Sequence, residues 1–409
     1  MKPLEEARSE VLSSVGLLGV EYVPIWQARG RVLAADVVAP ENVPPFANSA
    51  MDGFAVRGAD VSAAGAVLDV IGDLPAGVSP DIEVGPGEAI KIMTGAPIPP
   101  GADTVARVEE TAMEGSKVTI ASAVEPGTSV RPAGGDVPEG QLVFTAGTRL
   151  TPMHVGVLAT IGIGTPVVFE RPRVAFMSTG DELTPPDADG LEPGAIRDSN
   201  RPMLLALLED AGVEPIDLGI IPDDPDVLRE ALTRAAESDV VVSTGGVSMG
   251  DYDVTKMVLQ GDAHVDFWQV AIQPAKPFAF GHIGDALFFG LPGNPVSVLV
   301  SFEQFARPSL LKMQGARHVL RPQLVARAGE ALATDPEKTV FVRVVVEGLE
   351  AGPPVVVKSG DQASNVLSAA AAADGFALVP RGTATIEPGD PVLVEMFKWP
   401  ESREWIDGR

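Results

Sequence analysis

The spacing of apolar residues changes along the chain and divides it into segments of different expected structure. Near the N-terminus, apolar residues recur on one helical face at Leu4, Ala7, Val11, Leu12 and Val15. This spacing predicts a helix over residues 3–19. Residues 40–150 instead place short Val- and Ile-rich runs between Pro- and Gly-rich turns, which predicts a β-rich domain with many loops. Residues 148–170 return to a helical pattern.

Residues 173–316 alternate strand-like and helix-like patterns. The predicted strands are Val174–Ser178, Ile216–Ile221, Val240–Thr244, Val265–Val270, Phe278–Gly281 and Ala286–Gly290. The predicted helices cover about 201–211, 226–237, 253–260 and 295–314. Strand and helix alternation at this spacing predicts a parallel sheet covered on both faces.

From about residue 317 the pattern is β-like again. The predicted strands are Thr339–Val346, Pro354–Lys358, Phe376–Pro380 and Pro391–Phe397. The Ala-rich run Leu367–Ala373 predicts a short helix. This segment is interpreted as a small C-terminal β domain, and the length of 409 residues agrees with several domains.

Composition narrows the chemistry. The chain has no cysteine, which excludes disulfides and thiolate ligands, and its four histidines show no ligand spacing. A bound metal would then be held by carboxylates, which favours Mg²⁺. The net charge of −26 argues against a nucleic-acid partner. The longest weakly polar stretch, Val155 to Phe169, is short and interrupted by Gly and Pro, so we expect no membrane span and a cytoplasmic protein.

The loop after Val240–Thr244 is the strongest candidate for binding phosphate. Gly245 and Gly246 allow backbone N–H groups to approach an anion, and Ser248 can donate its hydroxyl. The competing interpretation is an ordinary tight turn between strand and helix. A second loop carries Asn294 before Pro295, an arrangement typical of a helix N-cap followed by Pro at the first helical position.

Carboxylates follow several of the predicted strands. Glu182, Asp223, Asp251 and Asp253 stand where strands end, so we expect them to converge on the edge where ligands bind to such sheets. Carboxylates beside a phosphate-binding loop fit a Mg²⁺-assisted phosphoryl or nucleotidyl reaction, with Glu182, Asp251 and Asp253 as the expected metal ligands. Each of them also has an ordinary interpretation as a helix cap or turn residue. Lys276 follows another strand and has either an anion or solvent as its partner.

Taken together, the motifs resemble those of the molybdopterin molybdenumtransferase family (MoeA, and the E domain of gephyrin). The matching motifs, in the order of that family, are Ser49–Ala55, Thr94–Pro97 with Gly101–Asp103, Ser178–Leu183, Asp198–Asn200, Ser243–Asp253 and Leu291–Pro295. They extend over nearly the whole chain, and their combination is far more specific than any one of them.

The resemblance implies a multidomain α/β and β fold and an elongated homodimer. Residues 1–45 and 146–170 would form a helical connecting domain, and residues 46–145 an inserted β-rich domain. Residues 171–316 would form the parallel α/β domain that binds molybdopterin, and residues 317–409 a C-terminal β-barrel.

The resemblance also implies the reaction and its residues. The family inserts molybdate into adenylylated molybdopterin, releases AMP and needs a divalent cation, here expected to be Mg²⁺. The acidic residues carried over are Asp52, Asp136, Glu182, Asp223 and Asp253. The residues expected around the pterin and its anionic end are Thr94, Lys276, Pro292, Pro295, Arg343 and Ser364. Asp52 and Asp136 would reach the cleft from the inserted domain, across the dimer.

The chain departs from the family's pattern at four positions. Gly135 replaces a common Glu, Gln273 stands where many members carry Lys, Ala275 replaces Gly, and Gln269 lies where a Lys can occur. These changes put the affinity for the anion, or the choice between molybdate and tungstate, in doubt. Two other functions stay open: a nucleotide-processing enzyme with the same α/β domain, and a pterin-binding but inactive paralogue or scaffold.

Overall fold

The computed structural model describes residues 1–246, 258, 264–333, 335–348 and 352–399. The described chain forms two compact units. The sheet-and-barrel unit contains residues 1–21, 30–32 and 169 onward, and the insert unit contains residues 22–29 and 33–168. Ser248, Asp251, Asp253 and most of the helix expected over 253–260 lie outside the described residues.

A six-stranded sheet is the centre of the sheet-and-barrel unit. Its order is β16-β13-β17-β21-β20-β18. The strands are β13 (Arg173–Thr179), β16 (Glu214–Ile221), β17 (Val240–Thr244), β18 (His264–Gln269), β20 (Pro277–Ile283) and β21 (Ala286–Leu291). The expectation of an all-parallel sheet is wrong at β20, which runs antiparallel to both of its neighbours. Only Gly284 and Asp285 separate β20 from β21, and so short a connection can form a hairpin but no parallel crossover.

Helices cover both faces of this sheet, as the sequence predicts. Alternate residues of β13 enter different cores, because successive side chains of a strand point to opposite faces. Val174 and Phe176 pack under α3 (Asn200–Ala211), whereas Ala175 and Met177 pack under α4 (Pro225–Ala235). The helix predicted over 295–314 is present as one continuous helical segment, but its middle turn is π-helical. It consists of α6 (Pro295–Ser301), the π-helical turn η4 (Phe302–Ala306) and α7 (Arg307–Met313).

The N-terminal helix is shorter than predicted. α1 covers Leu4–Ser13, and Gly16 and Gly19 follow it. Its apolar face joins the core under α7, so it packs within the sheet-and-barrel unit. The helical pattern over 148–170 is likewise only partly realised, since α2 (Pro152–Thr160) is followed by β12 (Val167–Phe169). The proposed boundaries of the four domains stay a prediction.

The C-terminal segment forms the expected barrel. β24 (Thr339–Glu347), β25 (Val355–Lys358), β22 (Gln323–Ala328), β28 (Pro391–Met396) and β26 (Gly375–Val379) pair in that order, and a β24–β26 pairing closes the ring. Closure leaves none of these five strands with an unpaired edge. The short strand β19 (Ile272–Gln273) pairs with β24 and so joins the barrel to the chain of the α/β part. The remaining elements here are β23 (Leu332–Ala333), β27 (Thr385–Ile386) and α8 (Leu367–Ala372).

The insert unit contains a second six-stranded sheet, which confirms the expected β-rich insertion. Its order is β7-β4-β6-β5-β9-β8, and each of its faces carries a small apolar core. The strands are β4 (Gly53–Val56), β5 (Ala66–Leu74), β6 (Glu88–Ile92), β7 (Thr104–Arg107), β8 (Thr111–Glu114) and β9 (Lys117–Ile120). Shorter elements are β1 (Val20–Tyr22), β2 (Val37–Val38), β3 (Asn48–Ser49), β10 (Val130–Arg131), β11 (Leu142–Phe144) and the 3-10 turns at 25–27, 58–61 and 108–110.

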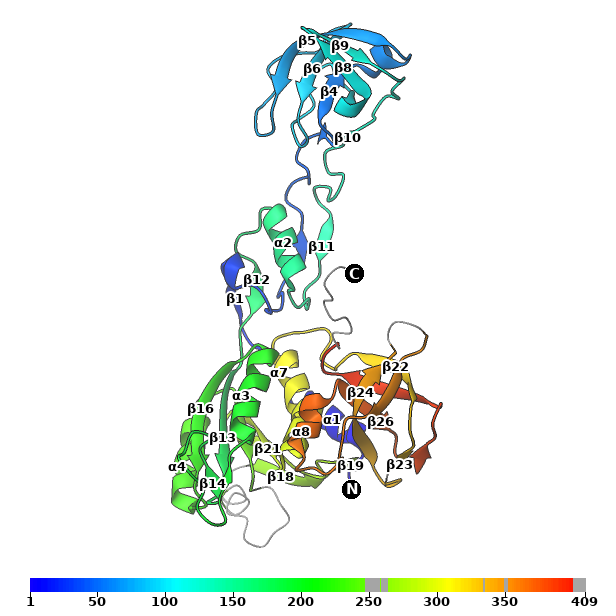
Figure 1. Cartoon of the computed structure of the whole chain (residues 1–409). Helices are drawn as coiled ribbons and strands as arrows, with labels where there is room; N and C mark the ends of the chain where they lie inside the picture. The colour runs from blue at the N-terminus through cyan, green and yellow to red at the C-terminus, as the bar shows by residue number, and fades with distance from the viewer. Residues whose placement is uncertain (247–257, 259–263, 334, 349–351, 400–409) are drawn as a thin grey trace. The chain divides into compact units, whose positions relative to one another are not determined.

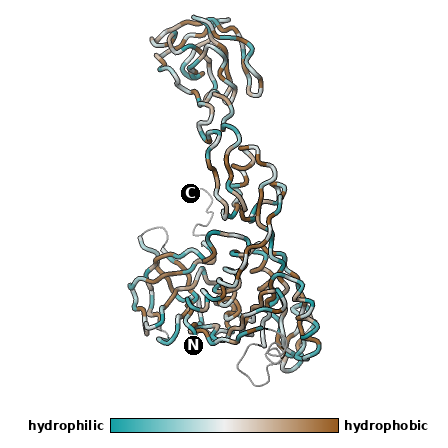
Figure 2. Tube along the Cα trace, turned by 180° about the vertical axis from the view of Figure 1, so that it is seen from behind, coloured by the Kyte–Doolittle hydropathy of each residue, from teal (hydrophilic) through white to brown (hydrophobic). Residues whose placement is uncertain are grey.

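Hydropathy alternates between apolar and polar along the trace of both units (Figure 2). Within the described residues, no helix has the length and apolar character that crossing a membrane requires.

Candidate functional site

A cavity of about 510 Å³ opens at the carboxyl edge of the α/β sheet. Strand ends and the loops that follow them supply its lining, as expected for this class of sheet. Among the lining residues are Thr179, Glu182, Asp198, Asn200, Thr244, Gly245, Gly293, Asn294, Pro295 and Asn365. Four of the residues predicted from the sequence, Glu182, Gly245, Asn294 and Pro295, therefore lie around one space.

The glycine loop after β17 begins as the sequence suggests. Gly245 and Gly246 have φ angles of +88° and +64°, in the left-handed region that favours glycine. A Cβ atom on Gly245 would lie 2.6 Å from the carbonyl oxygen of Thr179, so no other residue fits beside β13 without a shift of the backbone. The described part of the loop thus has the close approach and backbone freedom of a phosphate-binding turn.

Three carboxylates gather at the ends of β13 and β16. The backbone N–H of Asp223 donates to Oδ1 of Asp181 at 3.0 Å, and the charge of Glu182 also acts on Asp223. Burial raises the pKa of Asp223, a hydrogen bond from the backbone of Asp181 opposes the rise, and the neighbouring charges of Asp181 and Glu182 add to it. Glu182 and Asp223 are thus brought together as predicted, and we name Asp181, Glu182 and Asp223 the acidic rim.

The described residues of the acidic rim do not by themselves form a complete metal site. Within the described ranges, no three carboxylates or histidines are arranged to hold a metal ion. Asp251 and Asp253, which the sequence adds to this edge, lie outside those ranges. The donor set itself is all oxygen, and that chemistry fits Mg²⁺.

A buried polar network lies beneath the cavity and was absent from the predicted site. Asp198, only 2% exposed, accepts hydrogen bonds from Ser178 Oγ, from the backbone N–H groups of Asn200 and Arg201, and from Arg201 Nε. Ser178 Oγ also lies 3.1 Å from Thr244 Oγ1, which links the ends of β13 and β17. The available signal was polar residues in otherwise apolar strands, together with the Asp198–Asn200 motif.

The loop before α6 contributes a buried proline and an exposed amide. Pro292 is buried, while Asn294 occupies the N-cap position of α6 with Pro295 following it, as predicted. The Asn294 side chain makes no capping hydrogen bond, so its amide is available to the cavity that it lines.

The predicted basic residues lie away from this cavity. Lys276 is exposed just before β20 and is absent from the lining. Arg343 is fully buried, and its Nη2 donates to the carbonyl oxygens of Asp361 at 2.9 Å and Ala363 at 3.2 Å. Burial lowers the pKa of the Arg343 guanidinium. Arg343 therefore holds the loop whose Ser364 carbonyl accepts from Val296 N at 3.1 Å and whose Asn365 reaches the cavity.

In the insert unit, Thr94 and Asp52 interact directly. The backbone N–H and the hydroxyl of Thr94 both donate to Oδ1 of Asp52, each at 2.7 Å. The backbone bond first and the hydroxyl bond second lower the pKa of Asp52, because both stabilise its ionised form. The contact of Thr94 with the ligand, which the resemblance implies, stays a prediction, and the structure adds that Thr94 orients an exposed carboxylate.

Asp136 is exposed on a different loop of the same unit. β3 and β10 pair antiparallel, with Ser49 opposite Val130 and Asn48 opposite Arg131. Asp52 follows β3 and Asp136 follows β10, so the two loops leave the pair at opposite ends. The described structure does not bring these two carboxylates into contact.

The comparisons with known proteins cover nearly the whole chain. Residues 2–162 match the MoeA N-terminal region (domain I and II), residues 175–312 match a probable molybdopterin binding domain, and residues 325–397 match the MoeA C-terminal region (domain IV). A molybdopterin molybdenumtransferase of Haemophilus influenzae is 37% identical over 97% of this chain and 99% of its own length. The chain belongs to the molybdopterin molybdenumtransferase family.

A second relative and a solved structure of the same family match this chain over a similar length. A Mycobacterium tuberculosis protein named molybdopterin molybdenumtransferase 2 is 38% identical over 96% of this chain and 99% of its own. A solved MoeA protein of Pyrococcus horikoshii OT3 has a TM-score of 0.83 at 32% identity and covers 97% of this chain and 100% of that one. These matches confirm the resemblance found in the motifs and the expected multidomain fold.

The backbone at Ala275, one of the four expected departures from the family's pattern, has an unusual conformation. Ala275, where the resemblance leads us to expect Gly, has a φ angle of +76° and is 3% exposed. A residue with a Cβ atom is strained in this left-handed conformation. The loop that presents Lys276 thus has, at Ala275, a backbone conformation that glycine favours.

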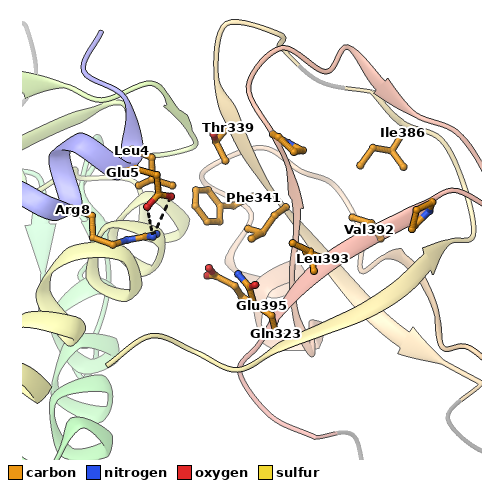
Figure 3. A pocket seen from close by; sticks show the side chains of 13 residues that line it. Leu4, Glu5, Arg8, Gln323, Thr339, Phe341, Ile386, Val392, Leu393 and Glu395 are labelled. Atoms are coloured by element: carbon orange, nitrogen blue, oxygen red, sulfur yellow. Dashed lines mark hydrogen bonds and ion pairs between the residues drawn. The ribbon is translucent and has the colours of Figure 1, made fainter. Parts of the chain in front are cut away.

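A second cavity, of about 500 Å³, lies between α1 and the open end of the barrel (Figure 3). It is largely apolar and contains none of the predicted site residues. Arg8 donates to Gln304 Oε1 from one side, and Gln304 Nε2 donates to Glu395 Oε2 at 2.7 Å. Burial raises the pKa of Glu395, while hydrogen bonds from Gln304 and the charge of Arg8 oppose the rise. This network joins α1, η4 and β28.

Proposed function

We propose that the protein inserts molybdate into adenylylated molybdopterin and releases AMP in a Mg²⁺-dependent reaction. The observation that supports this most is one cavity that is lined both by the glycine loop after β17 and by Glu182 of the acidic rim. It occurs in a chain whose relatives, over nearly their full length, are named molybdopterin molybdenumtransferases. The protein is then a transferase of molybdenum cofactor biosynthesis.

The charge around the cavity supports the dependence on a cation. Adenylylated molybdopterin and molybdate are both anionic, yet the lining includes the carboxylates of Glu182 and Asp198. The described cations nearby are already engaged: Arg197 donates to the carbonyls of Pro185, Pro186 and Ala188, and Arg201 pairs with Asp198. Glu182 and Asp223, with Asp253 by the family's pattern, would hold Mg²⁺, which when bound supplies positive charge to the phosphate oxygens.

The chain's own groups divide the remaining work. The glycine loop offers backbone N–H groups to phosphate, and the Asp198 network fixes the ends of β13 and β17 around it. Asp52 is held ionised by Thr94, which suits a ligand to a cation. We propose that Asp52 and Asp136 complete the site in a cytoplasmic homodimer.

The test is turnover by the purified full chain. Incubation with adenylylated molybdopterin, molybdate and Mg²⁺ should release AMP and yield cofactor that activates an apo-molybdoenzyme. Omission of molybdate should strongly slow the release. Pterin binding without any release of AMP would show instead an inactive, pterin-binding paralogue. Turnover of a pyridine nucleotide without pterin would favour the nucleotide-processing alternative.

A further inference from the structure

Asn200, the first residue of α3, lines the α/β cavity and is 8% exposed. Its Nδ2 donates to the carbonyl oxygen of Gly293 at 2.7 Å. A carbonyl oxygen can only accept, so this contact fixes which end of the amide is nitrogen. The other end, Oδ1, is buried and has no donor among the residues that the structure describes.

Three donors close to Asn200 are already engaged. The backbone N–H groups of Asn200 and Arg201 and the hydroxyl of Ser178 all donate to Asp198 Oδ1. The cavity lining also presents the carboxylate acceptors of Glu182 and Asp198. A buried acceptor without a partner is costly, and a ligand N–H at this place would remove that cost.

The proposed substrate limits what can donate there. Phosphate and molybdate oxygens are acceptors, so they cannot satisfy Oδ1. Adenine has an amino group, but each of its edges also presents a ring nitrogen that needs a donor of its own. The pyrimidinone edge of the pterin instead carries its amino N–H beside a ring N–H, and so offers adjacent donors to an acceptor-rich wall.

On the basis of the proposed function, we propose that Asn200 Oδ1 accepts a hydrogen bond from the pyrimidinone edge of the pterin and thereby orients the ring in the cavity. The Nδ2 contact to Gly293 holds the amide in the orientation that this requires. The pterin edge then lies toward the start of α3, and the phosphate toward the glycine loop after β17.

The test compares Asn200→Ala and Asn200→Asp with the wild type. Fluorescence measures the affinity of each protein for molybdopterin under anaerobic conditions, and AMP serves as the control ligand. Asn200→Ala should weaken the binding of molybdopterin about tenfold, the effect of one lost hydrogen bond. Its affinity for AMP should stay unchanged. Asn200→Asp keeps an acceptor but loses the donor to Gly293, so it should retain more affinity for molybdopterin than Asn200→Ala.

The result that would overturn this inference is equal binding of molybdopterin by Asn200→Ala and the wild type. Equal losses in both variants, or a parallel loss of AMP binding, would also overturn it, because they indicate a role in holding the Gly293 loop alone. Thermal unfolding of each variant verifies that it is folded. Failure of the wild type to bind molybdopterin would refute the proposed function itself, so the two failures are distinguishable.

Discussion

At the scale of single residues, the roles of side chains depend on neighbours that the sequence does not place. Motifs singled out Asp52 and Thr94 separately, as an acidic residue and as a residue near the ligand, and only the structure shows that Thr94 orients Asp52. Arg343 illustrates the opposite case. An arginine near an anionic ligand is a reasonable expectation, yet this one is buried within the barrel strand β24 and holds a loop. Burial of a strand residue depends on which face is covered, and that is decided by distant segments.

Replacement of Thr94 by valine should remove one of the two hydrogen bonds that Thr94 donates to Asp52. In Thr94→Val the hydroxyl bond is lost, so the pKa of Asp52 should rise toward its ordinary value of 3.8. Because the depressed pKa reflects stabilisation of the ionised form, that contribution is present above pH 3.8 and is lost as the pH falls through the folded-state value. We expect turnover to fall about 10- to 100-fold, as for a lost partner of a metal-binding group.

An NMR titration of Asp52, with Thr111→Val as a matched control in the same unit, measures this effect. Thr111 Oγ1 donates only to the backbone carbonyl of Val108 among the hydrogen bonds described for it. An unchanged pKa of Asp52 in Thr94→Val would contradict the orienting role.

Ala275→Gly should stabilise the fold. The positive φ of Ala275 is strained for a residue with a Cβ atom, so glycine should raise the free energy of unfolding by about 1 kcal/mol. Ala271→Gly is the control, since Ala271 is equally buried but has no positive φ, and it should lower that free energy. Chemical denaturation of both variants decides the matter, and a loss of stability in Ala275→Gly would show that its methyl contacts outweigh the strain.

At the scale of elements, hydrophobic periodicity predicted the existence of most strands and helices but not every direction or end. In α4, Leu228, Ala231, Leu232 and Ala235 are buried on the side that packs on the sheet, whereas the neighbouring Val227 is 40% exposed. The antiparallel β20 was missed because the alternation of strand and helix suggested crossovers throughout. The two-residue Gly284-Asp285 connection was the local signal for a hairpin.

The contact of α1 with η4 and β28 predicts a dependence of stability on pH. The pKa of Glu395 is raised in the folded state, so its ionisation opposes folding. This destabilisation is absent below the unfolded-state value of 4.5, and it develops as the pH rises from there through the folded-state value. Glu395→Gln cannot ionise, and its stability relative to the wild type should therefore increase as the pH rises through this window.

Urea unfolding of the two proteins at pH 4 and pH 8 measures the change. Glu387→Gln, at an exposed position of the same barrel, is the control and should show no such trend. A constant difference between Glu395→Gln and the wild type at both pH values would refute the assignment of this dependence to Glu395.

At the scale of the whole molecule, local patterns predicted the α/β part, a β-rich segment before it and a small C-terminal β domain. The insertion of the first β segment and the closure of the second into a barrel were expected only from the family resemblance. The composition of the site is less local. Glu182 and Asp223 meet at one sheet edge, while Asp52 and Asp136 belong to the other compact unit. Motifs identified these residues one by one, and no local pattern encodes which of them share a site.

The central claim is that the acidic rim acts by holding Mg²⁺ for the release of AMP. The most direct measurement is the single-turnover rate of AMP release as a function of Mg²⁺ concentration. Glu182→Gln should shift the half-saturating concentration upward by about tenfold or more, with much of the rate restored at high Mg²⁺. Glu230→Gln, at an exposed position of α4, should behave as the wild type. AMP release that is independent of Mg²⁺, or a half-saturating concentration that is unchanged in Glu182→Gln, would contradict the claim.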